Sequence, residues 1–180
     1  MIRAPKREGN EMEAKKYNVL FICSGNSARS IIAETIANQL GRERLRAFSA
    51  GSQPTGYVHP MALRVLGNIG LPAEGLRSKS WNEFADPGAP EMDLVITVCD
   101  RAAEEHCPVW PGHPLTARWS VPDPAKAVGT EQEVEDAFRK AMFVLQQRIS
   151  LFLALRVEAI DRLVAESRIR AIGTDTGDAR

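Results

Sequence analysis

Residues 17–30 read YNVLFICSGNSARS and contain the strand and the loop that decide the fold. The first part, residues 17–22, is a short apolar run rich in strand-forming side chains, which predicts a buried strand. The loop after it holds only small or polar residues before Arg29. A helix should follow, because the next apolar residues are spaced as one helical face: Ala33, Ile36, Ala37 and Leu40. Gly41 is predicted to end that helix.

The rest of the chain repeats this alternation of strand and helix. The further predicted segments are a strand at 46–49, a helix opened by Pro60 and stopped by Gly70, a short helical turn at 81–84, a buried strand at 93–98, a strand at 117–121, a long amphipathic helix opened by a capping box of Thr130 with Glu133, and a helix at about 157–168. Such alternation implies right-handed crossovers and a parallel sheet. We therefore expect an α/β fold with a small four-stranded parallel sheet and helices on both faces.

The length of 180 residues suits one domain. Residues 1–16 are charged and without periodicity, so we expect a disordered N-terminal extension. The domain itself is predicted at 17–155. Residues 156–180 are predicted to form a C-terminal helix and a flexible tail, with the last dozen residues frayed.

Charge and hydropathy exclude several classes of partner. Basic and acidic residues both number 23, so the formal net charge is zero and nothing in the overall field recruits nucleic acid or an anionic membrane. No stretch approaches the roughly 18 apolar residues that a membrane helix needs. We expect a cytoplasmic monomer in which any bound anion is held by a local site made of a few neighbouring groups.

The loop at 23–30 is the best candidate for that anion-binding site. Its small residues let successive backbone N–H groups turn around a concavity that fits a tetrahedral oxyanion, and the following helix adds its positive end. Arg29 can offer two parallel donors, and Ser30 can steady a thiolate. The same field predicts a lowered pKa for Cys23, although a buried structural cysteine is the alternative. The candidate substrate-binding residues are Ser24, Gly25, Asn26, Ser27, Ala28, Arg29 and Ser30.

Residues 21–30 resemble the active-site loop shared by the low-molecular-weight protein tyrosine phosphatases and the arsenate reductases built on the same fold. The similarity extends over about residues 17–152, which is most of the chain. The resemblance implies a low-molecular-weight phosphatase-like fold. It also implies that the loop and Arg29 bind an oxyanion that the Cys23 thiolate attacks.

Two further cysteines distinguish the two groups of relatives. Cys99 follows the strand predicted at 93–98, and Cys107 comes eight residues later. Residues 96–111 resemble the redox segment of the arsenate reductases, which implies that Cys23 is the nucleophile, Cys99 the first resolving thiol and Cys107 the second. The final disulfide would be reduced by thioredoxin, or glutaredoxin with glutathione would resolve the intermediate. The alternatives are inert cysteines, or a zinc site with His106 and His113, whose spacing is unlike that of common zinc modules.

Asp123 lies between two prolines in a loop after the last predicted strand. The related families place a general acid in such an Asp-Pro loop, so the resemblance implies that Asp123 protonates the leaving oxygen. The phosphatases typically continue with tyrosine, whereas this chain has Ala125. A merely solvated aspartate in a turn is the alternative.

Some arsenate reductases of this type bind potassium near the loop. Asn26, Glu34 and Ser49 match those positions, but Lys79 lies in the region of the further acidic ligand. We therefore expect no metal, with Lys79 supplying the positive charge. His59, which precedes the helix-starting Pro60, is interpreted as a turn residue.

Together with these patterns, the resemblance implies an arsenate reductase that converts arsenate to arsenite through Cys23, Cys99 and Cys107, with assistance from Arg29 and Asp123. Phosphate or sulfate would mimic the substrate. No tightly bound cofactor is expected, because the reducing equivalents come from thioredoxin or glutaredoxin with glutathione. The first alternative is a low-molecular-weight protein tyrosine phosphatase or phosphomonoesterase. The second is a noncatalytic oxyanion or redox sensor.

Overall fold

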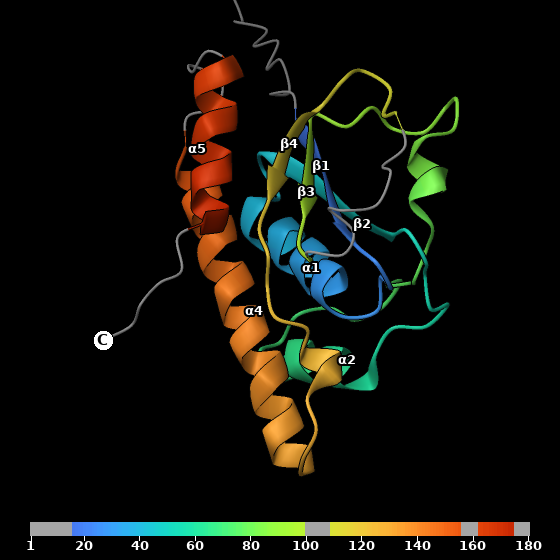
Figure 1. Ribbon diagram of the computed structural model, residues 1–180, viewed down its shortest axis with the longest axis vertical. Helices are drawn as coiled ribbons and strands as arrows, with labels where there is room; N and C mark the ends of the chain where they lie inside the picture. The colour runs from blue at the N-terminus through green and yellow to red at the C-terminus, as the bar shows by residue number, and fades with distance from the viewer. Residues whose placement is uncertain (1–15, 100–108, 156–161, 175–180) are drawn as a thin grey trace, which may run out of the picture.

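Four parallel strands form the centre of the molecule (Figure 1). The computed structural model describes residues 16–99, 109–155 and 162–174. The strands are β1 (Tyr17–Cys23), β2 (Leu45–Gly51), β3 (Leu94–Thr97) and β4 (Leu115–Arg118), and their order in the sheet is β2-β1-β3-β4. β1 pairs with β2 along its whole length and with β3 on its other edge. The predicted four-stranded parallel sheet is thus confirmed.

Except for α5, the helices begin and end close to the predicted positions. They are α1 (Arg29–Gly41), α2 (Pro60–Asn68), the 3-10 turns η1 (Trp81–Phe84) and η2 (Pro124–Lys126), α4 (Glu131–Ala154) and α5 (Arg162–Thr174). The capping box that opens α4 is present, because Thr130 Oγ1 accepts from the backbone N–H of Glu133 and the Glu133 carboxylate accepts from that of Thr130. Gly70, just after α2, has a φ of 72°, a left-handed conformation that suits glycine.

Side chains that alternate along β2 show which elements cover each face of the sheet. Leu45 contacts α1, since a Cβ on Gly41 would lie 2.6 Å from its side chain. Phe48 points the other way and packs on Phe84 of η1, with ring centroids 5.6 Å apart. α1 packs against α4, and Figure 1 shows α4 and α5 on the side of the sheet opposite η1. Helical elements therefore cover both faces, as predicted.

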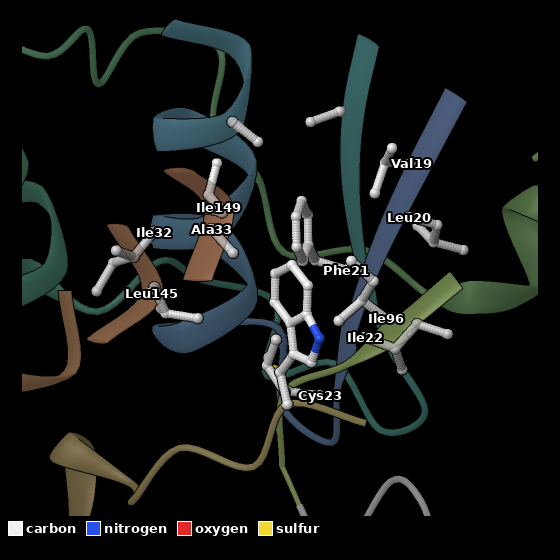
Figure 2. Close-up of a cluster of buried hydrophobic side chains, with 14 of the residues drawn as sticks. Val19, Leu20, Phe21, Ile22, Cys23, Ile32, Ala33, Ile96, Leu145 and Ile149 are labelled. Carbon is white, nitrogen blue, oxygen red and sulfur yellow. The ribbon is translucent and has the colours of Figure 1, made fainter. Parts of the chain in front are cut away.

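The core fixes the point where β1 ends and α1 begins. Figure 2 shows Ile32 and Ala33 of α1 beside Leu145 and Ile149 of α4, with Phe21 of β1 close by. These side chains are at most 1% exposed. Burying a large aliphatic or aromatic side chain contributes about 1.5–3 kcal/mol, so this cluster holds the strand end and the helix start rigidly together.

Most strand boundaries differ from the prediction by one or two residues, and the ends of β4 and α5 differ by more. β4 ends at Arg118, and residues 119–121 continue only as an extended segment in which Trp119 and Val121 donate to Thr97 O (2.8 Å) and Val98 O (3.1 Å). The fraying predicted from residue 169 is wrong up to Thr174, because α5 continues there and Ile169 is 1% exposed. The sequence of a short helix of mixed polarity does not indicate which side will be buried, because this depends on the elements against which the helix packs.

The division at 155/156 into a domain and a C-terminal part stays a prediction, and residues 1–15 lie outside the described part. No helix in the described segments is both long and apolar enough to cross a bilayer.

Candidate active site

The β1–α1 loop, residues 24–28, is held by backbone hydrogen bonds from the segment after β2. The carbonyls of Cys23, Ser24, Gly25 and Ser27 accept from the N–H groups of Ser52, Gln53, Thr55 and His59 over 2.8–3.3 Å. Since the C=O and N–H of one peptide unit point in opposite directions, carbonyls turned towards residues 52–59 turn the adjoining N–H groups away from them. The N–H of Asn26 accordingly points at Cys23 Sγ, 3.1 Å away. This arrangement is a backbone nest of the kind that binds anions.

Cys23 ends β1 at the base of this nest and is 3% exposed. Its Sγ lies 2.9 Å from Ser30 Oγ, as the predicted thiolate contact requires. Burial nevertheless raises the pKa of the Cys23 thiol above its ordinary value, against the lowering effect of the Ser30 hydrogen bond. The charge of Cys99 raises this pKa further, and that of Arg29 lowers it. The predicted lowering of the Cys23 pKa is therefore wrong for this structure, because desolvation outweighs the hydrogen bonds.

Arg29, the first residue of α1, forms an ion pair with Asp123, which precedes η2. Arg29 Nη2 lies 2.8 Å from Asp123 Oδ2, and Nη1 donates to Val121 O over 2.9 Å. The Nε of Arg29 is buried and has no hydrogen-bond partner in the described part of the chain. Asp123 is also the N-cap of η2, since its Oδ1 accepts from Ala125 N at 3.2 Å. The fold thus joins the loop arginine to the predicted acid.

Cys99 lies beside the same loop. It follows β3, is 2% exposed, and its Sγ is 3.7 Å from Ser24 Oγ. Cys23 and Cys99 are both thiols rather than members of a disulfide. Because a parallel sheet brings its carboxyl ends to one edge, the ends of β1 and β3 place two buried thiols together. Cys107 falls outside the described residues.

A cavity of about 620 Å³ opens between these groups. Its lining includes both thiols, Arg29 and Asp123, together with loop residues Ser24, Gly25, Ser27 and Ala28. Asn26 and Ser30, which were predicted to contact the substrate, do not line it and lie fully buried. Further lining residues come from the segment after β2 and from η2: Gln53, Thr55, Tyr57, His59, Ala125 and Lys126.

Asn26 supports the loop from behind. Its Nδ2 donates to Ser30 Oγ and to Ser49 Oγ, both at 2.9 Å, and its Oδ1 accepts from the backbone N–H of Lys79 at 2.7 Å. The φ of Asn26 is 43°, a conformation that asparagine tolerates better than most residues. A single buried side chain therefore connects the loop to β2 and to the segment before η1.

Lys79 supplies a buried positive charge in this region, as expected. Its Nζ lies 3.4 Å from Ser49 Oγ and 3.5 Å from Glu34 Oε2, and Ser49 donates to the same carboxylate at 2.5 Å. Burial lowers the pKa of Lys79 and the Glu34 charge raises it. The side chains of Asn26, Glu34 and Ser49, which match potassium ligands in some relatives, are thus engaged with one another and with an ammonium group.

Within residues 16–99, 109–155 and 162–174, no three His, Cys, Asp or Glu side chains are grouped so that they could hold a metal ion. The zinc alternative involves His106 and Cys107, which lie outside this part. His59 is the N-cap of α2, with Nδ1 accepting from Met61 N at 3.1 Å, as the turn interpretation requires. It also lines the cavity.

Two residues that shape the site, Gly51 and Arg148, were not identified from the sequence. Gly51 allows β2 to approach the loop, since a Cβ there would lie 2.4 Å from Ser24 O. Arg148, on the long helix α4, is 5% exposed and donates to the carbonyl of Ser120 at 2.9 Å. The glycine after a strand was a detectable signal for the first, whereas nothing in the helical pattern marked the second.

Comparison with known proteins places these features in a family. The sequence profile described as low molecular weight phosphotyrosine protein phosphatase matches residues 18–165. An arsenate reductase of Bacillus licheniformis is 34% identical over 138 residues, covering 76% of this chain and 95% of the relative.

Two solved structures share the fold at similar coverage. One, described as an arsenate reductase in the phosphate binding state, has a TM-score of 0.59 at 26% identity. The match covers 77% of this chain and 97% of that structure's chain. The arsenate reductase of Archaeoglobus fulgidus has a TM-score of 0.55 at 27% identity, and the match covers 73% of this chain and 98% of the Archaeoglobus chain. On the profile match and the 34% identity, this chain belongs to the low molecular weight phosphotyrosine protein phosphatase family.

Proposed function

We propose that this chain is an arsenate reductase that uses Cys23, Cys99 and Cys107 in a thiol relay. The observation that carries the proposal is that two buried thiols, Cys23 and Cys99, line one cavity whose wall holds Arg29. Hydrolysis of a phosphate ester needs only the first of these thiols, whereas two-electron reduction of arsenic(V) to arsenic(III) needs two. The 34% identical Bacillus licheniformis relative, itself named an arsenate reductase, supports this choice.

In the first step arsenate binds to the N–H groups of the 24–28 loop and to Arg29. The anion takes over donors of Arg29, which at present pairs with Asp123 at 2.8 Å. Cys23 Sγ then attacks arsenic, a sulfur–arsenic bond forms, and one arsenic–oxygen bond breaks. The thiol proton of Cys23 passes to the bound anion, and Asp123, released from Arg29, relays this proton to the departing oxygen, which leaves as water.

In the second step Cys99 attacks the sulfur of Cys23. A disulfide forms, the sulfur–arsenic bond breaks, and its electron pair stays on arsenic, which departs as arsenite. Cys107 then attacks Cys99 and releases Cys23, leaving a Cys99–Cys107 disulfide. Thioredoxin, or glutaredoxin with glutathione, reduces the enzyme in the cytoplasm. No metal or tightly bound cofactor takes part in these steps.

The test is arsenate-dependent NADPH oxidation, run separately with a thioredoxin system and with a glutaredoxin–glutathione system. We expect turnover with one of them in the wild type, loss of turnover in Cys99→Ser, and a Cys23–Cys99 disulfide in Cys107→Ser after arsenate treatment, mapped by mass spectrometry. Absence of both arsenite and any arsenate-induced disulfide would overturn the reductase. Arsenate binding without turnover in either system would favour the noncatalytic sensor.

A phosphomonoesterase is the second candidate, because Cys23, Arg29 and Asp123 alone meet the needs of ester hydrolysis. It predicts hydrolysis of an aryl phosphate that is unaffected by Cys99→Ser. Ala125 lines the cavity where the phosphatases typically carry tyrosine, which weakens stacking on a phosphotyrosine ring. Measuring both activities on the same Cys99→Ser protein separates the two functions.

A further inference from the structure

The 119–123 segment, which carries Asp123, is anchored at three consecutive residues. The Trp119 side chain is fully buried, and its Nε1 donates to Ile169 O of α5 at 2.8 Å. The carbonyl of Ser120 accepts from Arg148 Nη1, and that of Val121 accepts from Arg29 Nη1, both at 2.9 Å. The guanidinium groups of Arg148, which is buried, and Arg29, whose side chain is 12% exposed, therefore hold adjacent peptide carbonyls just before the predicted acid.

Arg148 connects this segment to the C-terminal helix. Its Nη2 donates to Gly173 O of α5 at 3.1 Å while Nη1 holds Ser120 O. Burying a charged group is costly unless hydrogen bonds compensate it, and here main-chain carbonyls of two separate elements accept from Nη1 and Nη2 of a side chain that is 5% exposed. Replacing this side chain would release both carbonyls at once.

α5 also approaches β4 unusually closely at Gly173. A Cβ at this position would lie 1.9 Å from Arg118 O and 2.6 Å from the Trp119 ring, so only glycine fits. α5 packs beside β4, as Figure 1 also shows. The family match ends at residue 165, so the part of α5 that makes these contacts lies beyond the matched body.

We propose that Arg148 is a positioning residue and that it acts with α5 to set the 119–123 segment, and hence Asp123, relative to Arg29. The connection runs from Gly173 O through Arg148 to Ser120, and from the next residue, Val121, to Arg29 and the cavity. The consequence for turnover rests on the proposed function, whereas the positioning itself does not. A displacement of about 1 Å in a catalytic group is enough to slow a reaction about 100-fold.

The experiment compares the full-length wild type with Arg148→Met, Arg148→Lys and Gly173→Val. Arg170→Met is the matched control, because Arg170 is an exposed α5 arginine whose Nε donates to Thr116 O of β4. Amide hydrogen exchange is measured on peptides that cover 119–127, with peptides from β1 and α1 as an internal reference. Arsenate turnover is measured in parallel, and thermal unfolding and near-UV circular dichroism check that each variant folds.

We expect faster exchange at 119–127 in Arg148→Met and in Gly173→Val, with β1 and α1 unchanged. We also expect kcat to fall about 10- to 100-fold while KM for arsenate changes less than about threefold, since the 24–28 loop is held independently. Arg148→Lys should recover part of both losses, because an ammonium group reaches one carbonyl where the guanidinium reaches two. Arg170→Met should match the wild type.

Exchange at 119–127 that stays at the Arg170→Met level in both Arg148→Met and Gly173→Val overturns the proposal. So does a KM that rises as much as kcat falls, because this indicates general disruption of the site. If Arg148→Met does not fold, Gly173→Val decides, since it leaves Arg148 in place, and Gly173→Ala provides a milder displacement. A wild type that never reduces arsenate refutes the proposed function alone, and the exchange result still tests the positioning.

Discussion

Two segments meet at the cavity and differ in how far they depend on side-chain contacts. The 24–28 loop is fixed by main-chain hydrogen bonds, with its carbonyls paired to the N–H groups of residues 52–59. The 119–123 segment has two main-chain hydrogen bonds, to Thr97 O and Val98 O, and is otherwise fixed by side-chain contacts of Arg29, Arg148 and Trp119. A loop held mainly by its backbone keeps its shape when most of its side chains change, with the buried Asn26 as an exception. A segment held by side chains is sensitive to single substitutions far along the chain.

The largest expected effect is the loss of turnover in Cys23→Ser, a variant that removes the nucleophile and should leave the shape of the 24–28 loop unchanged. Cys23→Ser should lower arsenate turnover by about 10⁴-fold or more, because the nucleophilic sulfur is lost. Phosphate binding should remain within about threefold, since the loop carbonyls keep their pairing with residues 52–59 and a serine hydroxyl can still accept from the N–H of Asn26. Calorimetric titration with phosphate and the coupled assay measure the two quantities. Loss of phosphate binding in this variant would contradict the backbone-held description of the loop.

Asp123→Asn tests the segment held by side chains. Turnover should fall about 10²- to 10⁴-fold, because the amide cannot give up a proton to the leaving oxygen. Phosphate should bind at least as tightly as in the wild type, since the competing 2.8 Å ion pair with Arg29 is weakened. Weaker phosphate binding would show that Asp123 supports the anion site rather than competing with the anion.

Gly51→Ala attacks the backbone-held loop directly. The added Cβ would lie 2.4 Å from Ser24 O, so the loop or β2 must shift. Such overpacking costs about 1–3 kcal/mol, and we expect both a lower free energy of unfolding and weaker phosphate binding. Gly67→Ala is the matched control, since a Cβ there meets nothing within 4 Å. Equal stability of the two variants by urea unfolding would contradict the close approach.

The smallest effect concerns the pH dependence of Cys23. Burial raises its pKa and the Ser30 hydrogen bond lowers it, so Ser30→Ala should raise this pKa further. A raised pKa means less thiolate at a given pH. The rate of Cys23 alkylation should therefore increase only above the pH at which an ordinary thiol ionises, about 8.5, and at still higher pH in Ser30→Ala. Mass spectrometry in a Cys99→Ser, Cys107→Ser background isolates this thiol. An unshifted profile would show that Ser30 does not influence the ionisation.

Much of the fold could be predicted because its signals are local. The apolar run at 17–22, Gly41, Pro60 and the Thr130 capping box each act within a few residues of their position, and the structure has the corresponding elements at these places. The end of β4 and the course of α5 were predicted less well. Their positions depend on contacts of Trp119, Arg148 and Gly173 between segments far apart in the sequence.

The candidate site divides in the same way. The sequence by itself determined the small-residue loop, its arginine and the presence of cysteines at strand ends, because these depend on residue type and spacing. Only the tertiary structure decided that the Cys23 pKa is raised, that Asn26 and Ser30 stand behind the cavity, and that Arg29 is paired with Asp123. Burial and pairing are properties of what surrounds a group in space, and the sequence does not specify those neighbours until the chain has folded.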